Sequence, residues 1–206
     1  MTKRRVVVTG LGLISPVGNT VEAGWADIVA GKSGITPITH FDATDMPVRF
    51  CGAIRDFEVT DYIPRKEARK MDAFIHYGIA ASMQAIQDAG LEVTDENAER
   101  IGISVGSGIG GLPGIEDGYG SYLKGGARKI SPFFVPRSII NMVSGNLSIQ
   151  YGIKGPNLAL VTACATGTHS IGYAARMISY GEVDVMIAGG AEMASTPTGI
   201  GGFASA

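Results

Sequence analysis

The sequence predicts an α/β protein with a mixed, mostly parallel sheet, and three observations support this prediction. Short apolar runs alternate along the chain with segments of helical periodicity. The runs are rich in valine and isoleucine and are bounded by glycine, which is typical of buried strands. With 206 residues, of which 45% are hydrophobic and 17% charged, the chain can bury one sizeable core.

The first half is expected to begin with a buried strand at residues 6–14, because three consecutive valines lead into a glycine-containing turn. A helix is expected at 21–30, followed by a loop-rich stretch at 32–61. The clearest periodicity predicts one long helix over 65–89, which ends at Gly90. The apolar face of this helix consists of Met71, Phe74, Ile75, Ile79, Met83 and Ile86.

The second half alternates between strands and helices. Strands are expected at 101–105, 158–161 and 183–188, and helices at 138–151 and 164–180. Residues 106–137 are rich in glycine and proline, so a long irregular segment of functional importance is expected there. The tail, 189–206, is small and glycine-rich and is expected to stop without a terminal element.

Composition excludes several classes of function. The 17 lysines and arginines face 19 acidic residues, so the chain lacks the positive field that nucleic-acid binding needs. Two cysteines and three scattered histidines form neither a disulfide framework nor a metal site, and no metal is expected. No run of about 18 apolar residues occurs, so no membrane span is expected. This cysteine usage favours a reducing, cytoplasmic setting.

The candidate nucleophile is Cys164, at the point where a predicted buried strand leads into a helix. The first N–H groups of a helix have no internal partner, so they stabilise a thiolate and can donate to an oxyanion. A free cysteine is more often a small buried residue, and this alternative stays open. Cys51 lies in a predicted loop and is interpreted as structural. The helical face expected in the core comprises residues 164, 167, 171, 175 and 178.

None of the three histidines is an obvious partner for the thiol. His169 follows Cys164 by five residues and is therefore about 140° around the helix. His40 lies in a loop, and His76 lies on the polar flank of its helix. Any catalytic partner of Cys164 is therefore expected outside these residues.

A glycine-rich segment, Gly106-x-Gly108-x-x-Gly111, has the letters of a dinucleotide fingerprint. Such a fingerprint needs a helix that opens directly after the loop, but Pro113 follows instead. We therefore interpret the loop as a turn, and a dinucleotide-dependent oxidoreductase is the least favoured alternative.

Two groups of basic residues could bind an acidic partner. Arg65, Lys66, Arg69 and Lys70 form one stripe at the expected start of a helix, where their charges oppose the helix dipole. Arg128 and Lys129 form a smaller group. A solvated face explains both groups equally well, and an acidic protein surface is the other interpretation.

Five segments of the chain form a recognisable pattern. They are Val-Val-Val-Thr-Gly-Leu-Gly (6–12), Gly-Ser-Gly-Ile-Gly-Gly (106–111), Ile-Ser-Pro-Phe-Phe-Val-Pro (130–136), Thr-Ala-Cys-Ala-Thr-Gly (162–167) and Ala-Gly-Gly-Ala-Glu (188–192). Together they resemble the β-ketoacyl-[acyl-carrier-protein] synthases, and Phe-Phe-Val-Pro is similar to the type II enzymes of bacterial fatty-acid synthesis. The resemblance covers all 206 residues but only the first half of that family's fold.

The resemblance implies a thiolase-like, layered α-β-α-β-α fold, with residues 1–206 as its N-terminal half. It implies that Cys164 accepts the acyl group and that its backbone N–H is one oxyanion donor. It further implies a cytoplasmic homodimer without a cofactor. The implied acyl pocket consists of Ile109 as a gate, Ala163, Phe203 and Phe134 from a partner subunit. The implied acyl carrier protein site consists of Lys66, Arg69 and Lys70, with Arg128 and Lys129 beside them.

The implied reaction is decarboxylative Claisen condensation in fatty-acid elongation, in which malonyl-carrier attacks the acyl-enzyme to give a β-ketoacyl product. The family's decarboxylating histidines and lysine come from its second half, and the first half's sheet is expected to lack a strand here. An alternative of the same fold is a non-catalytic subunit that binds acyl groups or carrier. Such a subunit would lack the reactive cysteine, so Cys164 argues against it.

Overall fold

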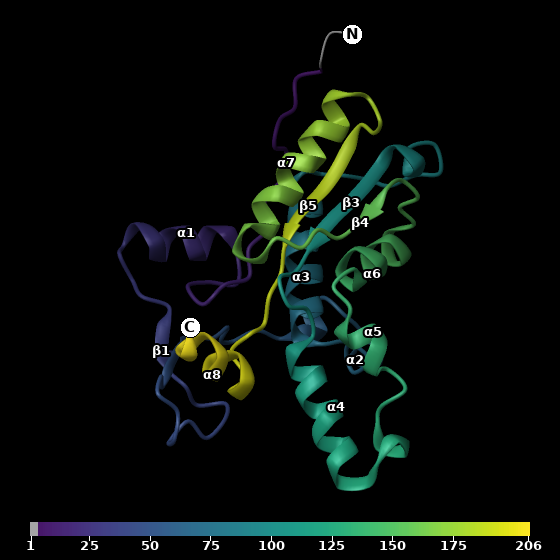
Figure 1. Ribbon diagram of the computed structural model, residues 1–206. Coiled ribbons are helices and arrows are strands. Elements are labelled where there is room, and N and C mark those ends of the chain that lie inside the picture. The colour runs from purple at the N-terminus through teal and green to yellow at the C-terminus, as the bar shows by residue number, and fades with distance from the viewer. Residues whose placement is uncertain (1–3) are drawn as a thin grey trace.

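The computed structural model describes residues 4–206 and centres on a parallel sheet of three strands in the order β4-β3-β5 (Figure 1). The strands are β3 (Ile101–Gly106), β4 (Asn157–Leu158) and β5 (Val185–Gly190). β3 and β5 pair from Ile101↔Val185 to Gly106↔Gly190. The strand predicted at 101–105 is confirmed as β3. β5 lies two residues later than the strand predicted at 183–188. β4 is shorter than the strand predicted at 158–161 and begins one residue earlier.

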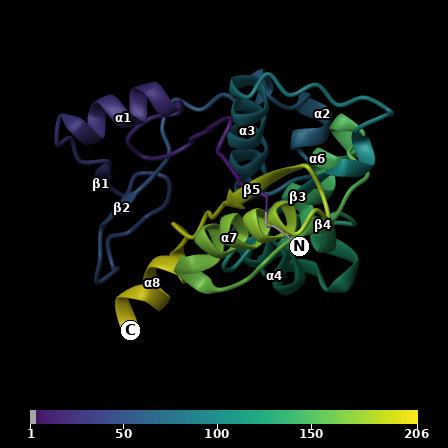
Figure 2. The ribbon, with the colours of Figure 1, turned by 90° about the horizontal axis from the view of Figure 1, so that it is seen from above.

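Helices cover both faces of this sheet (Figure 2). α7 (Thr166–Ser179) packs on one face, and α3 (Ala73–Asp88) and α6 (Met142–Tyr151) pack on the other. Every residue of β3 is buried, as is typical of a strand in a parallel sheet that is covered on both faces. The buried core includes Ile63, Phe74, Ile75, Ile79, Ile101, Ile103, Val105, Val143, Leu147 and Ile187.

The helix predicted over 65–89 is interrupted. It consists of α2 (Arg65–Ala68) and α3, because Asp72 between them acts as the N-cap of α3. The buried carboxylate of Asp72 accepts from the backbone N–H of Phe74 at 3.5 Å and of Gly114 at 2.8 Å. Burial raises the pKa of Asp72. The predicted end of the helix is confirmed, since Gly90 follows it with a positive φ of 58°.

The segment predicted to be irregular, 106–137, is mostly helical. α4 (Leu112–Gly125) has its proline in the first turn, where the missing N–H costs no helical hydrogen bond. The 3-10 turn η3 (Ala127–Lys129) and α5 (Phe134–Ser138) follow, and α6 begins four residues later than predicted. The expectation that the tail has no terminal element was also wrong, because α8 (Pro197–Ser205) begins with a proline and is capped by Thr196.

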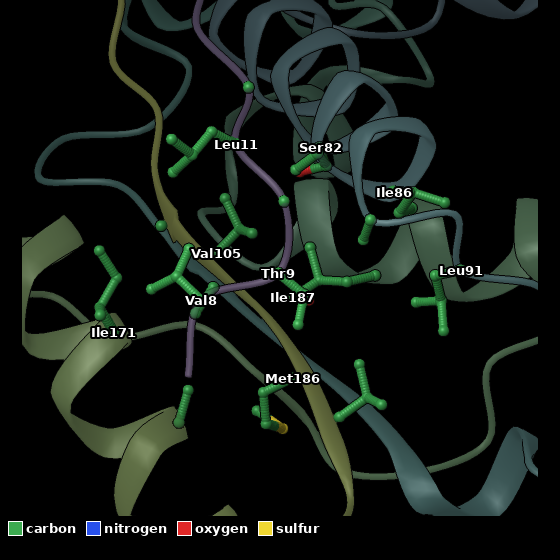
Figure 3. A pocket seen from close by; sticks show the side chains of 18 of the residues that line it. Val8, Thr9, Leu11, Ser82, Ile86, Leu91, Val105, Ile171, Met186 and Ile187 are labelled. Atoms are coloured by element: carbon green, nitrogen blue, oxygen red, sulfur yellow. The ribbon is translucent and has the colours of Figure 1, made fainter. Parts of the chain in front are cut away.

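The N-terminal region differs most from expectation. Residues 6–14 form no strand, although α1 (Val21–Val29) is confirmed. Residues 6–12, α3, α7 and β5 line a cavity of about 510 Å³, and residues 6–12 form no strand pairing with β5 (Figure 3). The N–H groups of Leu11 and Leu13 donate instead to side chains of α3, Asp88 at 2.9 Å and Gln84 at 3.0 Å. The side chain of Val8 is 74% exposed. β1 (Ile35–Pro37) and β2 (Phe50–Gly52) lie in the stretch predicted to be a loop and form a separate antiparallel pair. The parallel and antiparallel strands therefore belong to two sheets and not to the one mixed sheet that was predicted.

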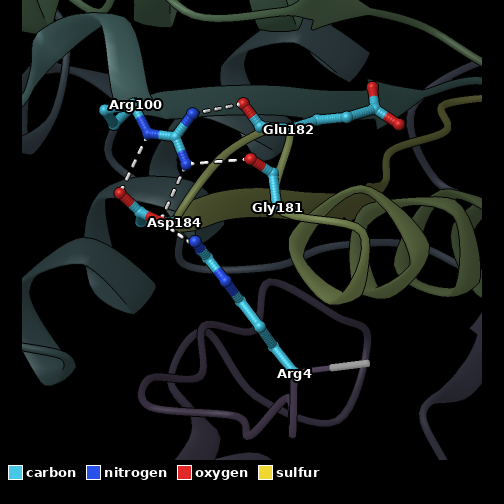
Figure 4. A network of polar contacts seen from close by, with 5 residues as sticks. All are labelled: Arg4, Arg100, Gly181, Glu182 and Asp184. Atoms are coloured by element: carbon cyan, nitrogen blue, oxygen red, sulfur yellow. Dashed lines mark hydrogen bonds and ion pairs between the residues drawn. The ribbon is translucent and has the colours of Figure 1, made fainter. Parts of the chain in front are cut away.

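An ion-pair network fixes the amino ends of β3 and β5 (Figure 4). Arg100 donates to both carboxylate oxygens of Asp184, at 3.0 and 2.9 Å, and also to the carbonyls of Gly181 and Glu182. Arg4 donates to Asp184 at 2.6 Å. The side-chain hydrogen bonds from Arg100, and then those from Arg4, lower the pKa of Asp184 from 3.8 to about 2.

Candidate active site

Three chain segments meet beyond the carboxyl ends of the parallel strands, which all point to one edge of the sheet. They are the glycine-rich loop after β3, residues 163–165 after β4, and residues 191–192 after β5. The N–H of Ala191 donates to the carbonyl of Gly106 at 3.0 Å and so joins the first segment to the third. Ligands commonly bind at this edge of an α/β sheet, so it is the candidate active site.

Cys164 lies at this edge, directly before α7, as the sequence predicts. It is the middle residue of the 3-10 turn η4 (Ala163–Ala165), and it is exposed. Within residues 4–206, no hydrogen bond engages its backbone N–H, which is therefore free to donate to an oxyanion. The alternative of a small buried cysteine is excluded by this exposure. Cys51, by contrast, is buried in β2, and burial raises the pKa of its thiol.

The turn that carries Cys164 has a strained backbone conformation. Ala163 has a φ of +50°, in the left-handed region that residues other than glycine rarely adopt. Hydrogen bonds of Thr162 hold this geometry. Its N–H donates to Thr166 Oγ1 at 2.9 Å, and its carbonyl accepts from Ala165 N at 3.0 Å. Hydrogen bonds that join Thr162, before Cys164, to Ala165 and Thr166, after it, therefore hold the strained conformation of Ala163.

Two glycines set the position of α7 on the sheet. A Cβ on Gly190 would lie 3.1 Å from the backbone of Gly167, so the first turn of α7 sits directly on the end of β5. The sequence predicted that the face of α7 with Ile171 lies in the core. This prediction was wrong, because Ile171 is exposed. α7 contacts the sheet through a neighbouring row instead, and the buried residues of that row are Thr166, Ser170, Ala174 and Met177.

The glycine-rich loop is occupied by a carboxylate from the chain itself. Glu192 accepts from the N–H groups of Gly108 at 2.8 Å and Ile109 at 3.0 Å, and from Ser107 Oγ at 3.1 Å. The argument that no helix opens after this loop was wrong, since α4 begins at Leu112. Nevertheless, these N–H groups are not free for a phosphate, which disfavours a dinucleotide site. Glu192 was missed as a site residue, although its segment was singled out in the sequence.

None of the three histidines contacts the thiol in the described part of the chain. His169 Nδ1 lies 2.7 Å from Thr162 Oγ1, and His76 Nε2 lies 2.9 Å from the carbonyl of Ala68. His40 Nε2 lies 2.6 Å from the carbonyl of Ser195. Burial lowers the pKa of His76. Among residues 4–206, no histidine is therefore hydrogen-bonded to Cys164 as its base.

Comparisons with known proteins identify the family. Residues 3–206 match "Beta-ketoacyl synthase, N-terminal domain". The chain belongs to the β-ketoacyl synthase family. It is 60% identical to the 3-oxoacyl-[acyl-carrier-protein] synthase 2 of Vibrio harveyi, over all of this chain and 50% of that protein. It is 59% identical to the protein of the same name from Vibrio cholerae, with the same coverage. The chain thus spans about half the length of the curated relatives that it matches.

Solved structures agree with this membership. The ishigamide ketosynthase/chain length factor has a TM-score of 0.87 at 30% identity and covers 98% of this chain with 51% of its own. A type II PKS acyl-carrier protein in complex with its ketosynthase bound to the hexaketide gives a TM-score of 0.80 at 30% identity, over 98% of this chain and 54% of that chain. The fold is therefore the thiolase-like ketosynthase fold, in its N-terminal half.

The residues that the resemblance implies for an acyl pocket belong to four different segments. Ile109 is in the glycine-rich loop, and Ala163 is in the strained turn beside Cys164. Phe203 is on α8 and is 66% exposed. The ring of Phe134 packs against Gly118 of α4, where an added Cβ would lie 2.6 Å from two ring carbons. None of these four residues lines the cavity of Figure 3.

The basic residues expected to bind carrier are at the surface. Lys66 lies in α2, Arg69 directly after it, and Arg128 and Lys129 in η3, and all four are exposed. Lys70 is half-buried, forms an ion pair with Glu67 at 2.7 Å and lies 6.0 Å from the ring centroid of Phe133. The prediction that these basic charges oppose a helix dipole was wrong. α2 is a single turn, and Arg69 is the residue that caps its carboxyl end.

Two further classes of site are not found. Among residues 4–206, no group of three or more histidine, cysteine, aspartate or glutamate residues could hold a metal ion. In the same part of the chain, none of the helices is both long enough and apolar enough to span a membrane.

Proposed function

We propose that residues 1–206 are the N-terminal half of a β-ketoacyl-[acyl-carrier-protein] synthase that works in the cytoplasm as a homodimer without a cofactor. The observation that supports this most strongly is the exposed Cys164, on a strained turn at the mouth of α7 with an unengaged N–H. The 3-oxoacyl-[acyl-carrier-protein] synthase 2 proteins to which the chain is similar support the substrate class.

In the first stage, the thiolate of Cys164 attacks the carbonyl carbon of an acyl thioester. A new C–S bond forms, and the bond to the carrier's sulfur breaks, so that the carrier leaves as a thiolate and takes up a proton. The backbone N–H of Cys164 donates to the oxyanion of the tetrahedral intermediate. The strained turn holds sulfur and N–H in one fixed arrangement before the substrate arrives.

In the second stage, malonyl-carrier loses carbon dioxide, and its enolate carbon attacks the acyl-enzyme. A C–C bond forms, the C–S bond to Cys164 breaks, and the thiolate is regenerated. Residues 4–206 supply the nucleophile and one oxyanion donor, but no histidine that contacts the thiol. The resemblance to the family implies that the groups that assist decarboxylation come from its second half.

The two cysteines provide a matched test. Incubation with a free acyl thioester is expected to add one acyl group to Cys164, because it is exposed, and none to the buried Cys51. The variant Cys164→Ala should lower acylation on the order of 10³-fold, whereas Cys51→Ala should retain it within about twofold. Mass spectrometry of tryptic peptides locates the acyl group. Acylation that persists in Cys164→Ala would exclude the proposed nucleophile, and the absence of any acylation would favour the non-catalytic subunit.

We further propose that the exposed cations Lys66, Arg69, Arg128 and Lys129, with Lys70, bind acyl carrier protein. The likeness to a ketosynthase that was solved in complex with its acyl-carrier protein supports this partner. As a separate part of the proposal, Phe134 of a partner subunit contributes to the acyl pocket.

The double variant Lys66→Glu/Arg69→Glu is expected to weaken acylation by carrier-bound substrate about tenfold or more, because it reverses two charges that face an acidic partner. Acylation by a small free thioester should stay within about twofold of the unaltered protein. The matched control is Arg55→Glu/Arg49→Glu, two exposed arginines outside the proposed site. An equal loss with both substrates would contradict carrier binding at this site.

A further inference from the structure

Glu192 forms the densest set of hydrogen bonds at the candidate active site. It lies just after β5, yet its carboxylate accepts three hydrogen bonds from the loop after β3. One oxygen binds the N–H groups of Gly108 and Ile109, and the other binds the hydroxyl of Ser107. Hydrogen bonds to a carboxylate are stronger than the neutral bonds of an ordinary turn.

The loop has little other support at these positions. The buried Ser107 accepts from the N–H of Gly110 at 3.0 Å, so the bonds of Glu192 continue through Ser107 to the next turn. Gly110 itself has a φ of +82°, a conformation that favours glycine. Without the carboxylate of Glu192, two successive N–H groups would lose their acceptor, and the backbone at Ile109 would be free to move.

This loop also lies against the turn that carries Cys164. A Cβ on Gly108 would lie 3.5 Å from the Cα and the carbonyl oxygen of Ala163, and 2.8 Å from the carboxylate of Glu192. Glycine at 108 therefore permits the close approach of the Glu192 carboxylate, whereas a Cβ there would be in ordinary contact with Ala163. The backbone of Ile109, a residue that is 41% exposed, is thus held next to this turn by a carboxylate from a third segment.

We infer that Glu192 is a positioning residue that anchors the loop of Ile109 beside Cys164 and thereby sets the acyl chain lengths that Cys164 accepts. This inference rests on the proposed function, because it takes Ile109 as part of the acyl pocket. Glu192 does not touch the reacting atoms. It acts through the backbone of Gly108 and Ile109.

The test compares acylation of Cys164 by hexanoyl and hexadecanoyl thioesters in the full protein. In Glu192→Ala, the ratio of the two rates is expected to move about tenfold towards unity, because Ile109 is no longer fixed. Glu192→Gln should restore most of the ratio, since its single carbonyl oxygen can still accept from both N–H groups. The matched control is Glu58→Ala, which removes a glutamate that accepts from the N–H and hydroxyl of Thr60.

Hydrogen exchange tests the anchor without any acyl chemistry. The amides of Gly108 and Ile109 are expected to exchange about tenfold faster in Glu192→Ala and to be unchanged in Glu58→Ala. Unchanged exchange would overturn the anchoring role. An unchanged rate ratio, or an equal fall for both chain lengths, would overturn the selectivity role. If the unaltered protein were not acylated at all, the proposed function and the selectivity role would fail together, while exchange would still decide the anchor.

Discussion

The parallel-sheet region and the N-terminal lobe, defined as residues 15–61 with α1, β1 and β2, are built in different ways. In the sheet region, β3 is buried along its whole length between α7 on one side and α3 with α6 on the other. In the N-terminal lobe only Gly24, Gly34 and Cys51 are buried, and large apolar side chains such as Trp25 are exposed. The site edge thus rests on a closed core, whereas the lobe has almost none.

This difference explains why the two cysteines have different environments. Cys164 stands at the end of a buried sheet, where the packing of α7 on β5 fixes the turn and leaves the thiol exposed. Cys51 is buried within a pair of three-residue strands, and no free helix end adjoins it. A rigid support with one exposed reactive group is what a nucleophile requires, and only the first region provides it.

A matched pair of phenylalanines provides the strongest test of this contrast. Phe74 in α3 is 0% exposed, whereas Phe50 in β2 is 58% exposed. Phe74→Ala is expected to lower the free energy of unfolding by about 3–5 kcal/mol, since it leaves a cavity in the core. Phe50→Ala should change the same quantity by about 0.5 kcal/mol or less. Urea denaturation followed by circular dichroism measures both. Similar losses in the two variants would mean that the lobe contributes to one common core.

The sequence predicts the sheet region better than the rest of the chain. The β-branched run at 101–105 was confirmed as β3, and Cys164 lies at the mouth of α7 as predicted. The strand predicted at 158–161 is instead the shorter β4 at Asn157–Leu158. The valine run at 6–14 has an equally strong strand pattern, but a strand also needs a partner edge. In the structure the N–H groups of Leu11 and Leu13 donate to side chains of α3 and not to β5, so local pattern alone was insufficient.

Prolines and one aspartate account for most of the other errors. Pro113 was interpreted as evidence against a helix, but it lies in the first turn of α4, where proline is favourable. Pro197 likewise lies in the first turn of α8, in the tail that was expected to have no terminal element. Asp72 lies inside a continuous helical pattern, and its N-cap role depends partly on the N–H of Gly114, which is distant in sequence. Glu192 could not be found from spacing either, because its partners in the loop after β3 lie more than 80 residues earlier.

The ion-pair network at the opposite end of the sheet gives a smaller, pH-dependent effect. Asp184 has a pKa of about 2 in the folded chain, against a usual 3.8, because Arg100 and then Arg4 bind its carboxylate. A lowered folded-state pKa adds stability that is fully present above about pH 4 and is lost as the pH falls towards 2. Asp184→Asn should therefore lower the Tm at pH 7, but by much less than Phe74→Ala, because the carboxylate is half exposed to solvent. The Tm difference from the unaltered protein should shrink steadily between pH 4 and pH 2.

The control is Asp95→Asn, which removes an exposed carboxylate with a single partner, Lys154, at 3.2 Å. A Tm difference for Asp184→Asn that does not depend on pH would show that the network braces the sheet by geometry and not by charge.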